Sequence, residues 1–407
     1  MEDLRLKFRG ALDRLGLDIS ANNYDRLHNK ETEPPRKTME RRTGVSWSKL
    51  KEWAATGNLP TPGEPDTTDR FTAILAENQR LGKSLSKARD ISQVIIDCCL
   101  TEIAKLKIAP VQIPRRETAT ENLEFHLMRS DAQVGQYTDA RWVQGVSRYD
   151  SQIYECRVNK LAEKVSLFRE QDHRSLGLNK LVVYHLGDQV EGEGIFKGQP
   201  FAIDLPGVEQ LFHSLRVEAG FVLFLASIFP EVEIFCVPGN HGRPGRKGDN
   251  HPKTNFDYVF YRLLQMTLER QENVKVYVSE SPSMLVRQGE FNCLLNHGDN
   301  ATSWNGIPYY GLDRVAKRVH ELYGMVINYN FCGHHHTPCN LADRVIMNGC
   351  LPGGSDFSVN RLTVATRPSQ KIFYFDKDHG INRESNLYLA EPVRMEADEN
   401  GIFTAYV

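Results

Sequence analysis

No run of apolar residues in this sequence approaches the length of a membrane span, and charges stand at its start where a secretory signal peptide would need an apolar core. Neither sign of charge is in excess, since 50 Lys and Arg face 52 Asp and Glu, for a formal net charge of −2. These absences predict no membrane partner. They also mean that any basic surface must be local, because the chain as a whole is not basic.

The eight cysteines are scattered and form no Cys-x-x-Cys pair, which excludes the usual ligand spacing of a structural zinc site. Cys236, Cys293 and Cys332 lie inside apolar segments that resemble strands. This distribution is typical of buried, reduced thiols, and it predicts a cytoplasmic protein. The sequence also lacks internal repeats and low-complexity segments.

The 407 residues exceed what a single hydrophobic core usually carries, so a large domain with a smaller one is expected. A cluster of proline and glycine between residues 60 and 65 marks a first boundary. The pattern predicts a helical, helix-turn-helix-like module over residues 1–63, a long helical linker over 64–112 and an α/β domain over 113–407.

Within the first module, residues 38–53 follow the outline of a helix, a glycine-containing turn, a serine cap and a second helix. Four basic side chains of this segment could reach DNA phosphates: Arg41, Arg42, Lys49 and Lys51. The alternative is a helical hairpin that only packs or dimerises, and both interpretations remain open.

Between Phe71 and Leu106, apolar side chains recur at helical spacing, and Pro110 and Pro114 follow. This segment is predicted to form a long helix that could self-associate, although its apolar seam is too imperfect for a coiled coil. A homo-oligomer formed through the N-terminal helical region is therefore one expectation.

Beyond residue 120, strand-like segments alternate with helical ones, which predicts an α/β domain. The predicted strands are Phe125–Ser130, Leu181–Leu186, Val232–Val237, Asn292–Asn296, Tyr329–Cys332 and Arg344–Met347. Polar clusters follow the carboxyl ends of these strands, where α/β folds place their ligands.

Five of these polar clusters carry side chains that bind metals. They are Asp131-Ala-Gln133, Gly187-Asp188, Gly239-Asn240-His241, Asn296-His297 and Gly333-His334-His335-His336. Each is common alone, but together they supply carboxylate, amide and imidazole ligands without thiolate, a set that suits Mn²⁺, Fe or Zn²⁺. Six or more such ligands indicate two divalent ions, roughly 3.5–4 Å apart if they act together.

The order of these motifs, over about residues 125–350, resembles the signature of the calcineurin-like metallophosphoesterases. The resemblance implies an α/β fold, a four-layer sandwich of two mixed β-sheets flanked by helices, with a small helical N-terminal domain. It also implies two divalent metal ions, Mn²⁺ first and Mg²⁺, Fe or Zn²⁺ as alternatives. A hydroxide that bridges the ions would attack phosphorus in line.

The resemblance further implies that Asp188 bridges the two ions. The other ligands divide into two sets, which are Asp131, Gln133 and His336 for one ion and Asn240, His297 and His334 for the other. His241 resembles the family's catalytic histidine, which is not a ligand and would donate a proton to the leaving-group oxygen.

Two positions depart from the family pattern. Gln133 stands where the family has His, which predicts a weaker first site that favours harder ions such as Mn²⁺. Gly242 stands where Asp or Glu often follows the histidine, so His241 is expected to lack a neighbouring carboxylate.

Two loops near the motifs are candidates for binding the substrate. The loop after His241 is rich in Gly, Pro and basic residues, and the loop after His297 is polar and aromatic. The candidate residues are Arg243, Arg246, Lys247, Lys253, Trp304 and Tyr309. Basic groups beside rings suit a polynucleotide strand. The alternatives are a solvated turn for the basic loop and packing at the start of a helix for the aromatic residues.

The leading prediction is a DNA nuclease that resembles the SbcD-type DNA repair exonucleases and phage-encoded members of the family. A phage-encoded enzyme would work in the host cytoplasm, with DNA as its partner. One alternative is a phosphatase or cyclic-nucleotide phosphodiesterase that acts on small phosphoesters. A second alternative is a DNA-binding or inhibitory module whose catalytic domain is vestigial.

Overall fold

The structure, a computed structural model, describes residues 2–16, 18–43, 45–58, 77–80, 82, 93–106, 108–116, 122–302, 308–391, 394–397 and 403–406. The contacts within the chain divide it into two compact units, Met1–Ile91 and Ser92–Val407. This division falls inside the segment expected to be a linker. Within the predicted long helix, residues 77–80, 82 and 93–105 are helical, and the rest of that segment lies outside the described residues.

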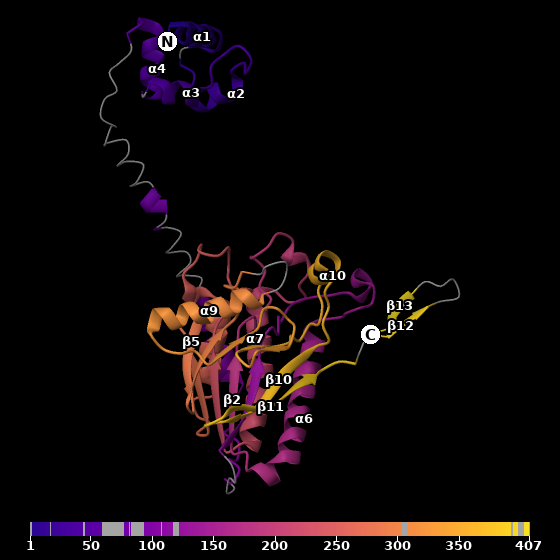
Figure 1. The fold of residues 1–407 in the computed structure, drawn as a ribbon. Helices are drawn as coiled ribbons and strands as arrows, with labels where there is room; N and C mark the ends of the chain where they lie inside the picture. Colours follow the sequence, from indigo (N-terminus) through magenta and orange to yellow (C-terminus); the bar gives the residue numbers. More distant parts are fainter. Residues whose placement is uncertain are drawn as a thin grey trace. The chain divides into compact units, whose positions relative to one another are not determined.

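The smaller unit begins with four helices that pack around a core of their own (Figure 1). They are α1 (Glu2–Leu15), α2 (Ala21–Leu27), α3 (Arg36–Thr43) and α4 (Trp47–Thr56). Apolar residues about one helical turn apart, such as Phe8 and Leu12 in α1 or Leu50 and Trp53 in α4, point inward together. The two helices predicted for residues 38–53 are present as α3 and α4, and Gly44 of the predicted turn lies outside the described residues.

The larger unit contains the two expected mixed β-sheets with flanking helices (Figure 1). The six-stranded sheet has the order β11-β10-β1-β2-β3-β4. Its first four strands in sequence run parallel, and the two late strands pair antiparallel. The strands are β1 (Leu123–Arg129), β2 (Lys180–His185), β3 (Glu231–Cys236), β4 (Val274–Val278), β10 (Ser369–Asp376) and β11 (Gly380–Tyr388).

The five-stranded sheet has the order β5-β6-β7-β9-β8, with β6, β7 and β9 parallel. Its strands are β5 (Ser283–Gln288), β6 (Phe291–Asn296), β7 (Tyr329–Cys332), β8 (Cys339–Leu341) and β9 (Val345–Met347). A hairpin of β12 (Arg394–Ala397) and β13 (Phe403–Tyr406) follows near the end of the chain. All six strands predicted from the sequence are confirmed, as β1, β2, β3, β6, β7 and β9.

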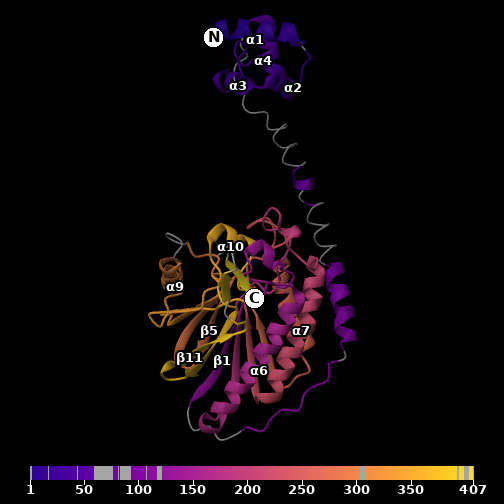
Figure 2. The ribbon, with the colours of Figure 1, turned by 90° about the vertical axis from the view of Figure 1, so that its right-hand side faces the viewer.

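The two sheets pack face to face because their strands bury both faces. In β2, Val182 and Tyr184 join the core between the sheets, while Leu181 and Val183 join the core beneath the helices. Helices α6 (Ser151–Leu176) and α7 (Gly207–Ile228) cover the six-stranded sheet (Figure 2), and α8 (Phe256–Thr267) packs on the same core. Helix α9 (Tyr309–Tyr323) packs against β7 and β9, and α10 (Asp356–Leu362) lies in the connection between β9 and β10.

Helix α7 corrects the expectation that no segment approaches a membrane span, because its length and composition would allow it to cross one. Half of its most apolar stretch is buried inside the unit, so its apolar side chains form core. The helix also carries Glu218, which is fully buried and forms an ion pair with Arg129 of β1. A core helix of this kind is weak evidence for a membrane.

Candidate metal centre

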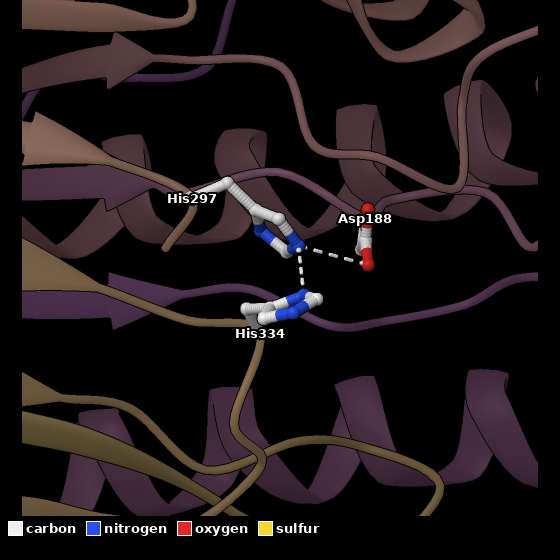
Figure 3. Close-up of side chains that lie close together, drawn as sticks. All are labelled: Asp188, His297 and His334. Carbon is white, nitrogen blue, oxygen red and sulfur yellow. Dashed lines mark hydrogen bonds and ion pairs between the residues drawn. The ribbon is translucent and has the colours of Figure 1, made fainter. Parts of the chain in front are cut away.

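Five strands bring the predicted metal ligands to one region of the larger unit. Asp131, Asp188 and Asn240 follow β1, β2 and β3 of one sheet, and His297 and His334 follow β6 and β7 of the other. Because these strands are parallel within each sheet, their carboxyl ends share one edge. Figure 3 shows Asp188, His297 and His334 directed toward one another.

His297 lies at the centre of a first group of side chains. Its Nε2 is 3.0 Å from Asp188 Oδ2, 3.1 Å from Asn240 Oδ1 and 3.2 Å from His334 Nδ1. Its other ring nitrogen, Nδ1, lies 2.7 Å from the carbonyl oxygen of Leu186, to which a protonated Nδ1 donates. That hydrogen bond favours the tautomer whose Nε2 is free to bind a cation, as is usual for histidines that bind metals.

The charges of this first group require a cation among the four side chains. Asp188 Oδ2 is buried and lies 3.0 Å from His297 Nε2, so within the described part of the chain it has a donor there only when that ring carries a proton. Burial opposes the charged form of His297, but Asp188 outweighs burial and raises the pKa of His297 to about 10. Burial and the nearby His297 lower the pKa of His334 to about 3, so that ring is neutral at pH 7. A proton on His297, or a metal ion bound by the group, can supply the positive charge.

Asp131, Gln133 and His336 form a second group. His336 Nε2 is 3.3 Å from Asp131 Oδ1 and 3.5 Å from Gln133 Nε2. The amide oxygen of Gln133 is buried and has no hydrogen-bond partner among the residues described. Leaving such an atom unsatisfied costs about 1–3 kcal/mol. A cation at this point would satisfy the oxygen, and the three predicted ligands of one ion are neighbours as that arrangement requires.

Hydrogen bonds from the backbone connect the two groups. The N–H of Asp131 donates to the carbonyl of Gly187 at 3.0 Å, and the N–H of Gln133 donates to that of Asp188 at 2.9 Å. The N–H of His334 donates to both carboxylate oxygens of Asp131, at 3.0 and 3.1 Å. The structure therefore brings all seven predicted ligands into one cluster.

The backbone at this cluster adopts an unusual conformation. Among the described residues, nine residues other than glycine have a positive φ, a region that side chains disfavour. Five of the nine are predicted ligands: Asp131, Gln133, Asp188, His334 and His336. Left-handed residues concentrate at functional sites, where the surrounding structure holds them in place. The fold thus maintains a local strain where the ligands converge.

His241 lies beside Asp188 and is held by Glu191. Its Nδ1 is 3.1 Å from the carbonyl oxygen of Glu191 and 3.0 Å from the carboxylate Oε2 of the same residue. Its Nε2 is 3.9 Å from Asp188 Oδ2 and therefore faces the first group. Burial opposes the imidazolium, but the two carboxylates outweigh burial and raise the pKa of His241 to about 9. The expectation that His241 lacks a neighbouring carboxylate is wrong, because Glu191 provides one.

Gly242 lies where a side chain would clash with the start of helix α8. A Cβ at this position would lie 2.3 Å from Asn255 Oδ1 and 2.8 Å from the backbone nitrogen of Asp257. A residue with any side chain could not fit there unless helix α8 moved. The first turn of α8 therefore occupies the space in which an acidic side chain at 242 would stand.

Asp257 and Asn255 are structural members of the site that the sequence analysis missed. The Asp257 carboxylate accepts hydrogen bonds from the backbone N–H of Asp188 and Gly239, at 2.7 and 2.8 Å, and from those of the two residues after Asp188. Asn255 caps α8 and donates to the carbonyl of Gly239 at 2.8 Å. An Asn-x-Asp pair at a helix start is typical of an ordinary cap, so only its position after the Gly239-Asn240-His241 motif could have singled it out.

The basic loop after His241 is largely neutralised by ion pairs. Arg243 and Lys247 both approach Asp299 Oδ2, at 3.3 and 3.4 Å, and Lys253 lies 2.7 Å from a carboxylate oxygen of Glu280. Arg246 is exposed and has no ion-pair partner among the described residues. The charge available to a substrate is therefore smaller than the sequence suggests.

The two predicted aromatic contacts have different outcomes. Tyr309 is the first residue of α9, and its hydroxyl lies 3.6 Å from Cys339 Sγ within the small core beneath that helix. The packing alternative therefore describes Tyr309. Trp304 lies outside the described residues.

A hollow of about 430 Å³ lies beside the loop that follows His297. Asn300 and Thr302 of that loop line it on one side, and α9 lines the other. The α9 residues are Tyr310, Gly311, Arg314, Val315 and Arg318. The two arginines are one helical turn apart and have no ion-pair partner in the part of the chain that the structure describes. This hollow combines unneutralised positive charge with an exposed ring.

The chain matches no protein-family model, and a search of curated proteins found no significant match.

Proposed function

We propose that this chain is a metal-dependent phosphodiesterase that binds two divalent cations and cleaves nucleic acid. The observation that supports it most strongly is the convergence of four ligand atoms on one point, from Asp188, Asn240, His297 and His334, beside a second group built around Asp131. Hard oxygen and imidazole donors without thiolate suit Mn²⁺, Mg²⁺, Fe or Zn²⁺. Such a donor set on the ends of five strands has no obvious structural purpose.

The residues present fit two cations. Asn240, His297 and His334 would hold one, Asp131, Gln133 and His336 would hold the other, and Asp188 would be the carboxylate shared by both. The buried Gln133 oxygen lacks a hydrogen-bond donor in the described chain, and Asp188 Oδ2 has His297 as a donor only when that ring is protonated, as expected of atoms that bind a cation. Two divalent ions so placed would supply a water that ionises near neutral pH and would neutralise charge on the phosphate.

His241 would act as the proton donor to the leaving oxygen. Its Nε2 faces the ligands, and the contact of Nδ1 with Glu191 fixes the ring and favours its protonated form. Glu191 is itself held by Gln199, whose amide nitrogen lies 3.0 Å from Glu191 Oε1. Such support restricts the ring to one orientation, which a proton donor requires.

Nucleic acid is the proposed substrate because of the hollow beside α9. Asn300, on its rim, is only three residues from His297, so the hollow lies within about 11 Å along the chain from a proposed ligand. Arg314 and Arg318 could bind successive phosphates, and Tyr310 could stack on a base. The ion pairs of the basic loop favour a second candidate, a phosphatase or cyclic-nucleotide phosphodiesterase acting on small phosphoesters.

The test uses purified protein with Mn²⁺ and three substrates: bis-p-nitrophenyl phosphate, labelled single-stranded DNA and labelled duplex DNA. We expect hydrolysis of all three and its loss in Asp188→Asn. Arg314→Glu with Arg318→Glu should impair DNA cleavage and spare the small ester. If that variant cleaves DNA as fast as the wild type, the result would favour the small-ester enzyme. If the wild type hydrolyses none of the substrates, the proposed function is refuted.

A further inference from the structure

Helices α3 and α4 form a helix-turn-helix whose second helix has one buried and one exposed face. Three residues, 44–46, connect the helices, and Ser46 is the N-cap of α4. Leu50, Trp53 and Ala54 of α4 belong to the core of the smaller unit. The opposite face of α4 is exposed, with Ser48, Lys49 and Glu52 among its residues.

The ion pairs of this unit are distributed unevenly between its helices. On α1, every basic side chain has an acidic partner: Arg5 with Glu2, Lys7 with Asp3, Arg9 with Asp13 and Arg14 with Glu33. In contrast, Arg41 and Arg42 at the end of α3 and Lys49 in α4 are exposed and have no ion pair within the described residues. Lys37, one turn before Arg41, is likewise exposed and without such a partner.

This separation of charge is not explained by stability. Exposed ion pairs such as those of α1 contribute little to the stability of the fold, but they cancel the field of that surface. Cations without partners repel one another, so their concentration on both sides of one turn disfavours the folded unit unless an anion binds there. Within the described residues, the exposed cations without ion pairs on the two helices that flank this turn are Lys37, Arg41, Arg42 and Lys49, which we call the basic surface; Arg26 of α2 is a further such cation.

We propose that this surface binds duplex DNA, with α4 in the major groove and the end of α3 against the phosphates. An α-helix is about 10–12 Å wide with its side chains, and the major groove is about 12 Å wide. Ser48, Lys49 and Glu52 on the exposed face of α4 would contact base edges or phosphates, and Arg41 and Arg42 would contact the backbone. This inference goes beyond the proposed hydrolysis, because none of its residues belongs to the metal centre.

The competing interpretation is that α3 and α4 pack against a second copy of the chain. The buried side chains of α4 already fill the unit's own core, and its exposed face is polar. Interfaces between copies are usually depleted of lysine and glutamate at their centre. The charge on this surface therefore favours a polyanion over a second copy.

The experiment measures binding of the full-length protein to a fluorescent duplex of about 25 base pairs, in EDTA so that no cleavage occurs, at several salt concentrations. Arg41→Glu with Arg42→Glu should weaken binding at least tenfold. It should also reduce the slope of log affinity against log salt concentration by roughly two, because two phosphates would no longer be neutralised by arginine. Arg41→Gln with Arg42→Gln should have a smaller effect of the same sign. It serves as the second test if charge reversal disturbs folding, which circular dichroism would show.

The matched control is Lys7→Glu with Arg9→Glu, the same change in charge on α1, which should change affinity less than threefold. Hydrolysis of bis-p-nitrophenyl phosphate should be equal in all variants. If even the wild type does not hydrolyse this ester, while Arg41→Glu with Arg42→Glu still weakens duplex binding, the hydrolase proposal fails and this inference stands. Duplex affinity that is unchanged in that variant overturns the inference, and a simultaneous change in sedimentation would identify the surface as an interface between copies.

Discussion

Asp257 Oδ2 accepts a hydrogen bond of 2.7 Å from the backbone N–H of Asp188, so one buried carboxylate orients the residue that carries another. Burial, and then the charge of Asp188, raise the pKa of Asp257 to about 6. Four backbone N–H groups donate to the Asp257 carboxylate and so offset the free-energy cost of its burial. The two loops after β2 and β3 are thereby fixed to the first turn of α8, and with them Asp188 and Asn240.

The first prediction concerns this contact. Asp257→Asn replaces one acceptor with an N–H that must face backbone N–H groups, which should destabilise the fold by about 1–3 kcal/mol. Because the loops would lose their orientation, Mn²⁺ affinity should fall about 10- to 100-fold. Chemical unfolding and calorimetric Mn²⁺ titration measure the two effects. Asp249→Asn, at an exposed position of the basic loop, is the control, and an unchanged Mn²⁺ affinity in Asp257→Asn would contradict the orienting role.

The residues of the site that could be predicted from the sequence are those that belong to short local sequence patterns. Each strand is a short apolar segment followed by a polar motif, so Asp131, Asp188 and His297 could be placed at strand ends from sequence alone. The contacts of Asp257 with Asp188 and of Asp299 with Arg243 join loops 69 and 56 residues apart. They depend on how the loops fold over one another, which no periodicity reveals.

The same reason explains the strands that were missed. β5 is exposed on alternate residues, and β8 has only three residues, so neither shows the apolar run that marked β2 or β3. β10 is a buried strand, but it returns to pair with β1 only after more than 200 residues. Its pairing is set by tertiary contacts that local propensity does not encode.

The second prediction concerns His241. His241→Asn should leave metal content unchanged and lower turnover about 10²- to 10⁴-fold, the usual contribution of a general acid. The loss should be smaller for a substrate that releases p-nitrophenol, which departs without a proton. Steady-state kinetics on good and poor leaving groups measure this, with His379→Asn at an exposed site as control. Equal losses on both substrates would exclude the proton-donor role.

The third prediction concerns stability in acid. Glu124 is buried, and burial opposes its charge, but the hydrogen bond from His126 and the charges of Lys180 and Lys377 outweigh burial and lower the pKa of Glu124 to about 2. A carboxyl whose pKa is lowered by folding stabilises the fold at pH values above its pKa in the unfolded chain, about 4.5. That stabilisation is lost as the pH falls toward 2. The contribution is about 3 kcal/mol at neutral pH.

Glu124→Gln should therefore lower the unfolding free energy at pH 7 and flatten its decline between pH 4.5 and 3. Urea unfolding at several pH values measures both effects. Glu290→Gln removes an exposed partner of Arg287 and should change neither, because exposed pairs contribute little. A variant with the same steep acid decline as the wild type would show that Glu124 is not the group responsible.

The last prediction concerns Gln133, whose amide oxygen is buried without a hydrogen-bond donor in the described chain and whose Nε2 is 3.5 Å from His336 Nε2. An amide oxygen is a weaker ligand than imidazole and carries no charge, so the ion in this group should be the more loosely held of the two. Gln133→His should tighten that site and favour Zn²⁺ more than the wild type does. Turnover need not rise, since Zn²⁺ could enter and slow the reaction.

The measurement is a titration of both bound Mn²⁺ and activity in the two proteins. We expect the wild type to need a higher Mn²⁺ concentration for saturation than Gln133→His. Gln144→His is the matched control, because Gln144 also has a positive φ but lies exposed, outside both ligand groups. If the wild type saturates at the same or lower Mn²⁺ concentration than Gln133→His, the Gln133 oxygen does not bind the ion. Its burial beside His336 would then have to be explained by packing alone.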